Sequence, residues 1–332
     1  MSSRIQVYGH EWAQQLLQRA MQQGAVRHAY LFLGPEHIGK TTLARAFAQA
    51  LTCENPTFDE GLGACGQCRS CRLAAEGVHP DHRFVAPAPG KQLLIDQIRE
   101  VVREAARSPI ESRYKVFIIS EFERANANAA NALLKTLEEP SATTRIILVS
   151  HQPSGLLDTI ISRCQLLRLR PLPEKQVVAL LQQQAGVAAP DDALRLARLS
   201  SGRPGVALAL AHDPTAWQSY QQRVQTMLAL LSASIAQRLE AATALEKDAH
   251  LETILQEWLL WWRDVLILQN QADALLVNQE QRAELERLAA QIDPSQVRRF
   301  IEALMKTAEI LRKNVNRQLA IEALLLKMPV AG

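Results

Sequence analysis

The chain has 332 residues, of which 48% are hydrophobic and 21% charged, and its formal net charge is +3 at pH 7. This length accommodates two or three domains, and the composition is that of an ordinary globular protein rather than a disordered one. The small net charge excludes a protein that holds nucleic acid by charge alone, so any contact with DNA must be local or shared with partners.

Neither export nor membrane insertion is predicted. Residues 1–12 lack the basic-then-apolar pattern of a signal peptide. The most apolar stretch, residues 258–268, is interrupted by Arg263 and Asp264, so it is too short and too charged to span a bilayer. We therefore expect a cytoplasmic protein with no membrane partner. In that reducing compartment cysteines bind metal more often than they form disulfides.

Three short apolar runs predict strands in the first half of the chain, at residues 30–33, 115–119 and 145–149. They are rich in β-branched and aromatic residues and lack polar alternation, which is typical of strands buried on both faces of a parallel sheet. Helical patterns lie between them. The first half therefore predicts an α/β domain with a parallel sheet flanked by helices.

Residues 34–41, which we call the phosphate loop, match the pattern G-x-x-x-x-G-K-[ST] in full. The loop follows the strand at 30–33 and opens a helical pattern, so its backbone N–H groups are expected to face phosphates. In this pattern the lysine reaches the β- and γ-phosphates and the following hydroxyl binds Mg²⁺. A chance glycine turn is the alternative. The residues predicted to bind ATP with Mg²⁺ are Gly34, Gly39, Lys40, Thr41 and Thr42.

Four cysteines lie within residues 53–71, a single segment that follows the phosphate-loop helix. They are Cys53, Cys65, Cys68 and Cys71. Four thiolates with no obvious open position predict a structural Zn²⁺ site. An iron–sulfur cluster and buried free thiols are the alternatives, although the spacing lacks the fourth cysteine and proline of ferredoxins. His79 and His82 lie nearby but are superfluous to a four-sulfur site, and Cys164 is expected to be a small buried apolar residue.

Strand patterns stop after Pro171 and Pro173. Residues 174–211 predict helices interrupted by a turn at 200–205, and the rest of the chain predicts an all-α domain. The predicted domains are residues 1–171, 172–212 and 213–332. Three tryptophans near 260 recur at helical spacing, which favours a core over a platform for stacking bases. They are Trp258, Trp261 and Trp262.

The phosphate loop followed by the cysteine cluster resembles the AAA+ subunits of bacterial clamp loaders. Three other segments share this resemblance: Asn-Ala-Leu-Leu-Lys-Thr-Leu-Glu-Glu-Pro at 131–140, Ser-Arg-Cys at 162–164, and Asn-Val-Asn-Arg-Gln-Leu at 314–319. The resemblance implies an AAA+ nucleotide-binding domain, a helical lid, and an all-α collar that joins subunits into a ring.

Two branches of this family fit unequally. Gamma/tau motor subunits carry Asp-Glu after the second-motif strand, whereas here Ser120 and Glu121 follow the strand at 115–119. A hydroxyl cannot replace the charge of a magnesium-organising carboxylate. The Gly-x-x-Arg motif of the motor subunits is also absent. Counting from Gly202, the position of its arginine is occupied by Gly205. The delta prime type is therefore predicted, and the motor type is the alternative. For this chain we expect weak or absent ATPase activity, with Glu121 as a candidate base.

Segments 79–81 and 94–99 also resemble the delta prime type. The resemblance implies a subunit of the DNA polymerase III holoenzyme that helps load the sliding clamp onto primed DNA. Its partners would be the gamma/tau motors and delta, with the clamp and primer–template DNA contacted through the assembled complex. A zinc-bearing nucleic-acid module is disfavoured by the near-neutral charge.

The resemblance also implies that Arg163, within the Ser-Arg-Cys segment, acts in trans on a neighbouring motor's nucleotide. The alternative is an arginine paired with a local carboxylate. Ser150 and His151, which follow the strand at 145–149, are either a γ-phosphate sensor or polar turn residues. Glu138 and Glu139 are expected to be a solvated helix end rather than a catalytic pair.

Overall fold

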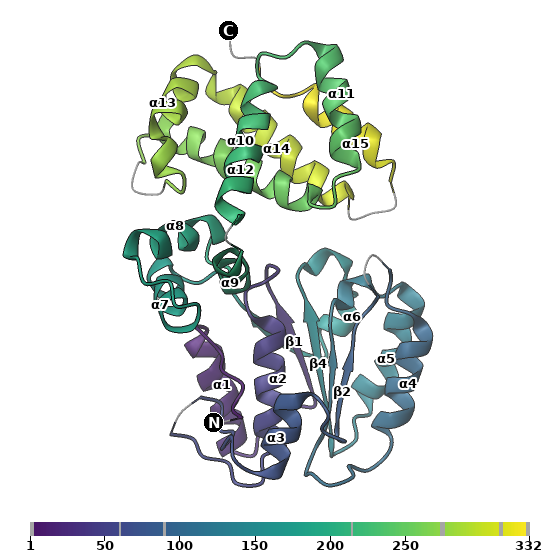
Figure 1. Cartoon of the computed structure of the whole chain (residues 1–332). Coiled ribbons are helices and arrows are strands. Elements are labelled where there is room, and N and C mark those ends of the chain that lie inside the picture. Colours follow the sequence, from purple (N-terminus) through teal and green to yellow (C-terminus); the bar gives the residue numbers. More distant parts are fainter. Residues whose placement is uncertain are drawn as a thin grey trace. The chain divides into compact units, whose positions relative to one another are not determined.

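A five-stranded parallel sheet with strand order β2-β3-β4-β1-β5 forms the centre of the first part of the chain (Figure 1). This computed structural model describes residues 3–59, 61–88, 91–213, 215–272, 276–311 and 315–329. The strands are β1 (Ala29–Leu33), β2 (His82–Val85), β3 (Lys115–Ile119), β4 (Thr144–Ser150) and β5 (Gln165–Arg168). The predicted strands at 30–33, 115–119 and 145–149 are confirmed, whereas β2 and β5 were missed.

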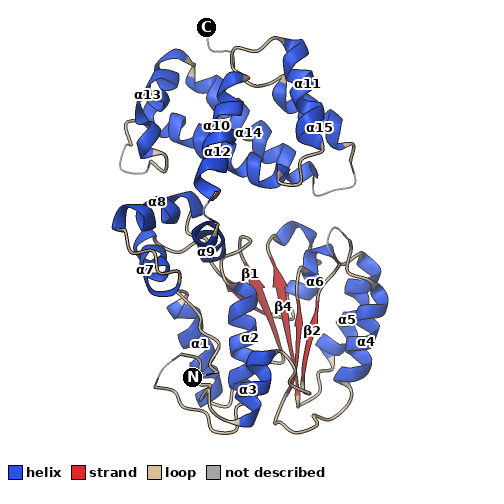
Figure 2. Cartoon of the chain, viewed as in Figure 1, coloured by secondary structure: helices blue, strands red, loops and turns tan. Residues whose placement is uncertain are grey.

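The chain forms two compact units, which are described separately: the first comprises residues 1–184 and 200–207, and the second residues 185–199 and 208–332. The predicted parallel sheet with flanking helices and the all-helical C-terminal region are confirmed (Figure 2). The three-domain division at 171/172 and 212/213 stays a prediction.

Helices cover both faces of the sheet in the first unit (Figure 1). On one face lie α1 (Glu11–Gln22), α2 (Lys40–Leu51) and α3 (Arg69–Glu76). On the other lie α4 (Ile95–Ala105), α5 (Ala127–Glu138) and α6 (Asp158–Ile161). The 3-10 turns η1 (Phe122–Arg124) and η2 (Pro153–Gly155), and then α7 (Glu174–Gln184), complete this unit together with the first residues of α9 (Pro204–His212).

The central strands are apolar at every position because each of their faces packs against a helical layer. In β1, Tyr30 and Phe32 belong to the core beneath α1 and α2. Leu31 belongs to the opposite core, beneath α4 and α5. Successive side chains of a strand alternate between its faces, so a strand buried on both sides shows no polar alternation.

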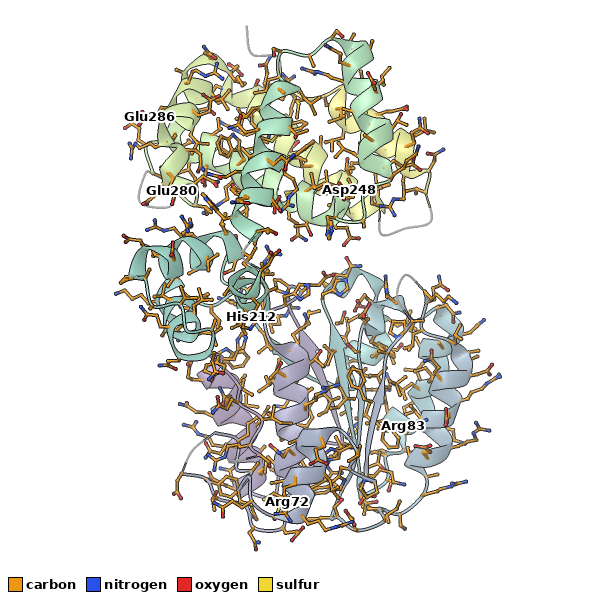
Figure 3. All side chains as sticks on the ribbon, in the orientation of Figure 1. Arg72, Arg83, His212, Asp248, Glu280 and Glu286 are labelled. Atoms are coloured by element: carbon orange, nitrogen blue, oxygen red, sulfur yellow. The ribbon has the colours of Figure 1, made fainter. Side chains whose placement is uncertain are left out.

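Strand β2 lies at one edge of the sheet, and its exposed positions explain why sequence patterning missed it. Arg83 is exposed (Figure 3), and it pairs with Glu100 of α4 across 2.9 Å. Phe84 is exposed too, with the Arg45 guanidinium 4.7 Å from its ring centre. In the sequence, His82 and Arg83 leave only Phe84 and Val85 as apolar residues of β2, which is too short a run to mark an interior strand.

Asp81, directly before β2, is a buried anchor for the loop that precedes β3. Its carboxylate accepts hydrogen bonds from the backbone N–H groups of Ile110, Glu111 and Ser112 and from the Ser112 hydroxyl. Burial alone would raise the pKa of Asp81, but these four donors outweigh it and lower the pKa. The segment 79–81 therefore has a structural role in ordering residues 110–112.

The second unit is entirely helical in its described residues. Its helices are α8 (Pro190–Ser200), α10 (Ala216–Ala229), α11 (Ile235–Glu246), α12 (Leu251–Gln269), α13 (Arg282–Gln291), α14 (Pro294–Leu311) and α15 (Arg317–Leu325), with the 3-10 turn η4 (Gln279–Gln281). Asn314, which opens the segment 314–319, lies outside the described residues. None of the described helices is long and apolar enough to cross a membrane.

The three tryptophans of α12 form the centre of this unit. Trp258, Trp261 and Trp262 are each 0% exposed, and the Trp262 ring meets Phe300 of α14 edge-on. Buried rings cannot stack on nucleic-acid bases, so the predicted core role is confirmed. The hydrophobic core of the second unit therefore depends on α12.

Arg238 of α11 is a buried cation that binds carbonyl groups instead of a carboxylate. Its guanidinium donates to the carbonyl oxygens of Leu230, Leu231, Leu325, Met328 and Pro329. Five N–H donors in a planar fork suit this arrangement. The contact joins α11 to the residues that end α10 and α15.

Replacing Trp258 with alanine is expected to destabilise the protein by about 3–5 kcal/mol, because it removes a fully buried aromatic side chain and leaves a cavity. Trp12→Ala is the matched control, since Trp12 is 49% exposed, and it should cost less than about 1 kcal/mol. Urea denaturation followed by circular dichroism measures both losses. Equal losses in the two variants would contradict the assignment of Trp258 to the core.

Candidate nucleotide and metal sites

The phosphate loop joins β1 to α2 through two glycines in the left-handed region, Gly34 (φ 155°) and Gly39 (φ 96°). A Cβ atom at Gly34 would lie 2.4 Å from the carbonyl oxygen of Leu169, which no side chain tolerates. Buried His10 supports the loop from outside, with Nε2 2.7 Å from the carbonyl oxygen of Ile38. The strand–loop–helix context expected for a phosphate-binding loop is therefore present.

Lys40 is buried at the first position of α2. Its ammonium donates to the carbonyl oxygens of Gly34 and Pro35, at 2.7 and 2.5 Å. Burial lowers the pKa of Lys40 to about 8, and the charges of Glu36 and Glu123 oppose this shift. Thr41 is half-buried and Thr42 is exposed. Their nucleotide contacts, like those of Gly34, Gly39 and Lys40, stay predictions.

The two residues after β3, Ser120 and Glu121, are both held by local contacts. Ser120 continues the sheet by donating from its N–H to the carbonyl oxygen of Val85. Glu121 has a left-handed backbone (φ 51°), and its carboxylate pairs with Arg124 across 2.9 Å. This pairing draws the Glu121 carboxylate toward the η1 turn, and its role as a base stays a prediction.

Glu123, two residues further on, is the carboxylate that sequence analysis missed. Its side chain is 2% exposed, and its Oε1 lies 2.7 Å from Nδ1 of His151. The other imidazole nitrogen of His151, Nε2, lies 3.3 Å from Oε1 of Glu36 in the phosphate loop. Burial would raise the pKa of Glu123, but hydrogen bonds from His151 and Ser150 outweigh it and lower the pKa.

These contacts bring three segments that are distant in the sequence to the carboxyl edge of the sheet. Glu36 follows β1, Glu123 follows β3 and His151 follows β4. In a parallel sheet the strand carboxyl ends share one edge, where ligands of open α/β folds bind. From the sequence, Glu123 could have been found only by the rule that residues after parallel strands meet at one edge of the sheet. No local pattern marks it, because the η1 turn that positions Glu123 depends on the left-handed backbone of Glu121.

Arg163 lies between α6 and β5 and is held by local contacts. Its guanidinium lies 2.7 Å from the Glu138 carboxylate and donates to the carbonyl oxygen of Thr159. Both side chains are partly solvent-accessible, at 34% for Arg163 and 49% for Glu138. The local ion pair is therefore present, and the trans role of Arg163 stays a prediction. The neighbouring Cys164 was expected to be buried but is only partly buried against the core beneath α4 and α5, and burial raises the pKa of its thiol to about 12.

The four cysteines converge on one point. Their Sγ atoms all lie within 4.8 Å of one another, with separations of 4.0 Å for Cys53–Cys68 and 3.9 Å for Cys65–Cys71. Four sulfurs at about 2.3 Å from a tetrahedral ion would be about 3.8 Å apart. The cluster therefore fits a single metal ion.

Backbone N–H groups point at several of these sulfurs. Cys65 Sγ accepts from the N–H of Gln67 and of Cys68, and Cys68 Sγ accepts from the N–H of Cys71. Burial opposes ionisation of Cys65, yet these donors prevail and lower the pKa of its thiol to about 7. Such donors favour the thiolate, which is the form that binds metal.

His79 and His82 lie behind the cluster and belong to a separate polar layer. His79 Nε2 lies 3.0 Å from the Ser70 hydroxyl, and His82 Nε2 lies 3.0 Å from the Thr52 hydroxyl. The two rings stack with centres 4.3 Å apart. Burial, and next the nearby His79, lower the pKa of His82 to about 3. Both histidines stand outside the four-sulfur group, as expected.

Comparison with known proteins gives matches along most of the chain. The family described as "DNA polymerase III, delta subunit" matches residues 9–173, and "DNA polymerase III, delta subunit, C terminal" matches residues 214–329. The DNA polymerase III subunit delta' of Bacillus subtilis is 32% identical over 322 residues, covering 94% of each chain. That of Pseudomonas aeruginosa is 38% identical over 229 residues, covering 68% of each.

A subunit with another name is also similar. The DNA polymerase III subunit tau of Bacillus subtilis is 37% identical over 172 residues, which cover 52% of this chain and 30% of that protein. A solved structure of a gamma subunit-related protein of DNA polymerase III from Thermotoga maritima aligns with a TM-score of 0.44 at 19% identity, covering 94% of this chain and 97% of that one.

Replacing Glu123 with glutamine is expected to cost about 1–2 kcal/mol at pH 7, and this cost should shrink in acid. The folded-state pKa of Glu123 lies below its ordinary value of 4.5. The stabilisation by its carboxylate is therefore present above pH 4.5 and is lost as pH falls through the folded-state pKa. Urea denaturation of both proteins between pH 7 and pH ~3.5 measures the difference. A difference that stays constant over this range would contradict the assignment.

Proposed function

The chain belongs to the DNA polymerase III delta prime family, and on this premise we propose that it is a clamp-loader subunit that helps ATP-dependent loading of the sliding clamp onto primed DNA. The proposal rests on similarity to delta prime subunits over nearly the whole length of one relative. Its partners would be the gamma/tau motor subunits and delta, in the cytoplasm. The clamp and the primer–template DNA would be met through the assembled complex.

Exposed leucines support a collar role for the second unit. Leu319 and Leu326, on or beside α15, are exposed, whereas Leu324 and Leu325 are buried in the core of the unit. Ile235 on the neighbouring α11 is exposed as well. Large apolar side chains at the surface suit a contact with another subunit.

We further infer that the chain binds ATP with Mg²⁺ but hydrolyses it weakly or not at all. The binding residues would be Gly34, Gly39, Lys40, Thr41 and Thr42. The weak hydrolysis follows from Ser120, which stands after β3 in place of a magnesium-binding carboxylate, and from Glu121, which pairs with Arg124. A motor-type subunit would need that carboxylate.

The observation that carries a trans role for Arg163 is its place in the sheet. β5 runs parallel to β1 with Tyr30 opposite Gln165, so Arg163, which precedes β5, lies at the amino edge. The phosphate loop leaves the carboxyl end of β1. The length of β1, about 13 Å at about 3.3 Å per residue, separates the two edges. This placement favours action on a neighbour's nucleotide over action on the chain's own.

Arg163→Ala is expected to slow ATP hydrolysis by the assembled clamp loader by about 10³-fold or more, because a trans arginine stabilises charge on the transferring phosphoryl group. Arg163→Lys should not restore the rate, since an ammonium lacks the forked geometry. Steady-state ATP turnover and clamp loading are measured with the reconstituted complex.

Arg83→Ala is the matched control for this experiment. Arg83 is an exposed arginine on β2, the strand at the opposite edge of the sheet from β5. Both variants should assemble normally, as size-exclusion chromatography would show. Normal turnover in an assembled Arg163→Ala complex would leave Arg163 with only its ion pair to Glu138.

We propose that the metal held by Cys53, Cys65, Cys68 and Cys71 is one structural Zn²⁺ ion. The spacing of the sulfurs suits a single tetrahedral ion, and all four positions would be filled by protein ligands. Zinc would order the loop between α2 and α3.

Cys68→Ser is expected to lower zinc content from about one ion per chain to near zero and to reduce the thermal midpoint, because one of the four ligands is lost. Cys164→Ser is the control and should retain zinc, since Cys164 lies outside the cluster. Elemental analysis by mass spectrometry measures the metal. Iron, or no metal, in the unmodified protein would exclude the zinc proposal.

A further inference from the structure

Glu36 places a negative charge inside the phosphate loop. It is the second of the four variable residues between Gly34 and Gly39. Its carboxylate lies 3.3 Å from Nε2 of His151 and is one-third exposed. It also acts on two cations, since its charge raises the pKa of Lys40 and that of Arg203 against the lowering by burial. One carboxylate thus interacts with three cationic or proton-donating groups.

These three groups come from different elements that meet at the loop. Lys40 begins α2 and His151 follows β4. Arg203 directly precedes α9, and the backbone N–H of Gly205 donates to the carbonyl oxygen of His37 across 2.9 Å. A Cβ atom at position 205 would lie 3.1 Å from that oxygen. The start of α9 is therefore packed directly on the loop residue next to Glu36.

His151 cannot easily turn away from this cluster. Its Nδ1 is held by the buried Glu123 at 2.7 Å, and its backbone N–H donates to the same carboxylate across 3.3 Å. With the ring fixed from one side, Nε2 faces Glu36. An incoming phosphate oxygen and the Glu36 carboxylate would therefore compete for the same nitrogen.

We propose that Glu36 is an internal anion that stands in for the terminal phosphate of a nucleotide, so that this subunit binds ATP no more tightly than ADP. The proposal rests on the proposed nucleotide binding and adds a specificity-determining residue to it. A γ-phosphate must displace the carboxylate from His151 or bind beside a like charge, whereas a diphosphate ends before that position. Either route lowers the affinity for ATP more than the affinity for ADP.

The test measures dissociation constants of Mg²⁺–ATP and Mg²⁺–ADP for the full chain by isothermal titration calorimetry. Glu36→Gln keeps the shape of the side chain and removes its charge. ATP affinity should rise by about 10-fold or more, because at an effective dielectric constant near 20 a like charge even about 12 Å away costs about 1.4 kcal/mol, while ADP affinity should change less than ATP affinity does. Glu76→Gln, an exposed substitution on α3, should change neither.

Lys40→Ala separates failure of this inference from failure of nucleotide binding itself. If Lys40→Ala abolishes binding and Glu36→Gln leaves the ATP-to-ADP ratio unchanged, the internal-anion role is overturned and the nucleotide site stands. If neither the unmodified chain nor Glu36→Gln binds ATP, both proposals fall. Circular dichroism confirms folding, and Glu36→Ala replaces the glutamine variant if that one misfolds, with the same expected change in ratio.

Discussion

The position of β1 between β4 and β5 is the constraint on which the first unit depends. Leu33, its last residue, lies opposite Ser150 on one side and Arg168 on the other. This register fixes where the phosphate loop leaves the sheet and which residues of β4 face it. It also sets the amino edge, where the chain enters β5 after Arg163. A one-residue slip would turn every β1 side chain to the other face and break both cores at once.

Much of this fold could be predicted because burial on both faces leaves a plain signal. Strands β1, β3 and β4 are continuous apolar runs, and the phosphate loop and cysteine spacing are local patterns. The edge strands β2 and β5 carry exposed polar residues and have no such run. The Glu36–His151–Glu123 group was beyond prediction, because it joins three loops and depends on the left-handed turn at Glu121.

The cysteine loop is held against α2 and the amino-terminal segment by polar contacts rather than by apolar packing alone. The buried amide of Gln49, on α2, donates to the carbonyl oxygens of Ser3 and Cys71 and accepts from the N–H of Ile5. The Ser3 N–H in turn donates to the carbonyl oxygen of Gly66. Gln49 thus links the amino-terminal segment, the phosphate-loop helix and the cysteine loop. Satisfied buried amides of this kind fix one arrangement, because any other leaves a polar group without a partner.

The Arg238 contact has a consequence for the order in which the second unit is completed during synthesis. The guanidinium belongs to α11, yet three of its five carbonyl partners are in residues 325–329. During synthesis, the residues of α11 leave the ribosome well before residues 325–329 do. Until they emerge, docking α11 in its final place would bury a cation with most of its acceptors missing, at a cost of several kcal/mol. Vectorial synthesis therefore leaves the helical unit open until the segment after α15 has left the exit tunnel.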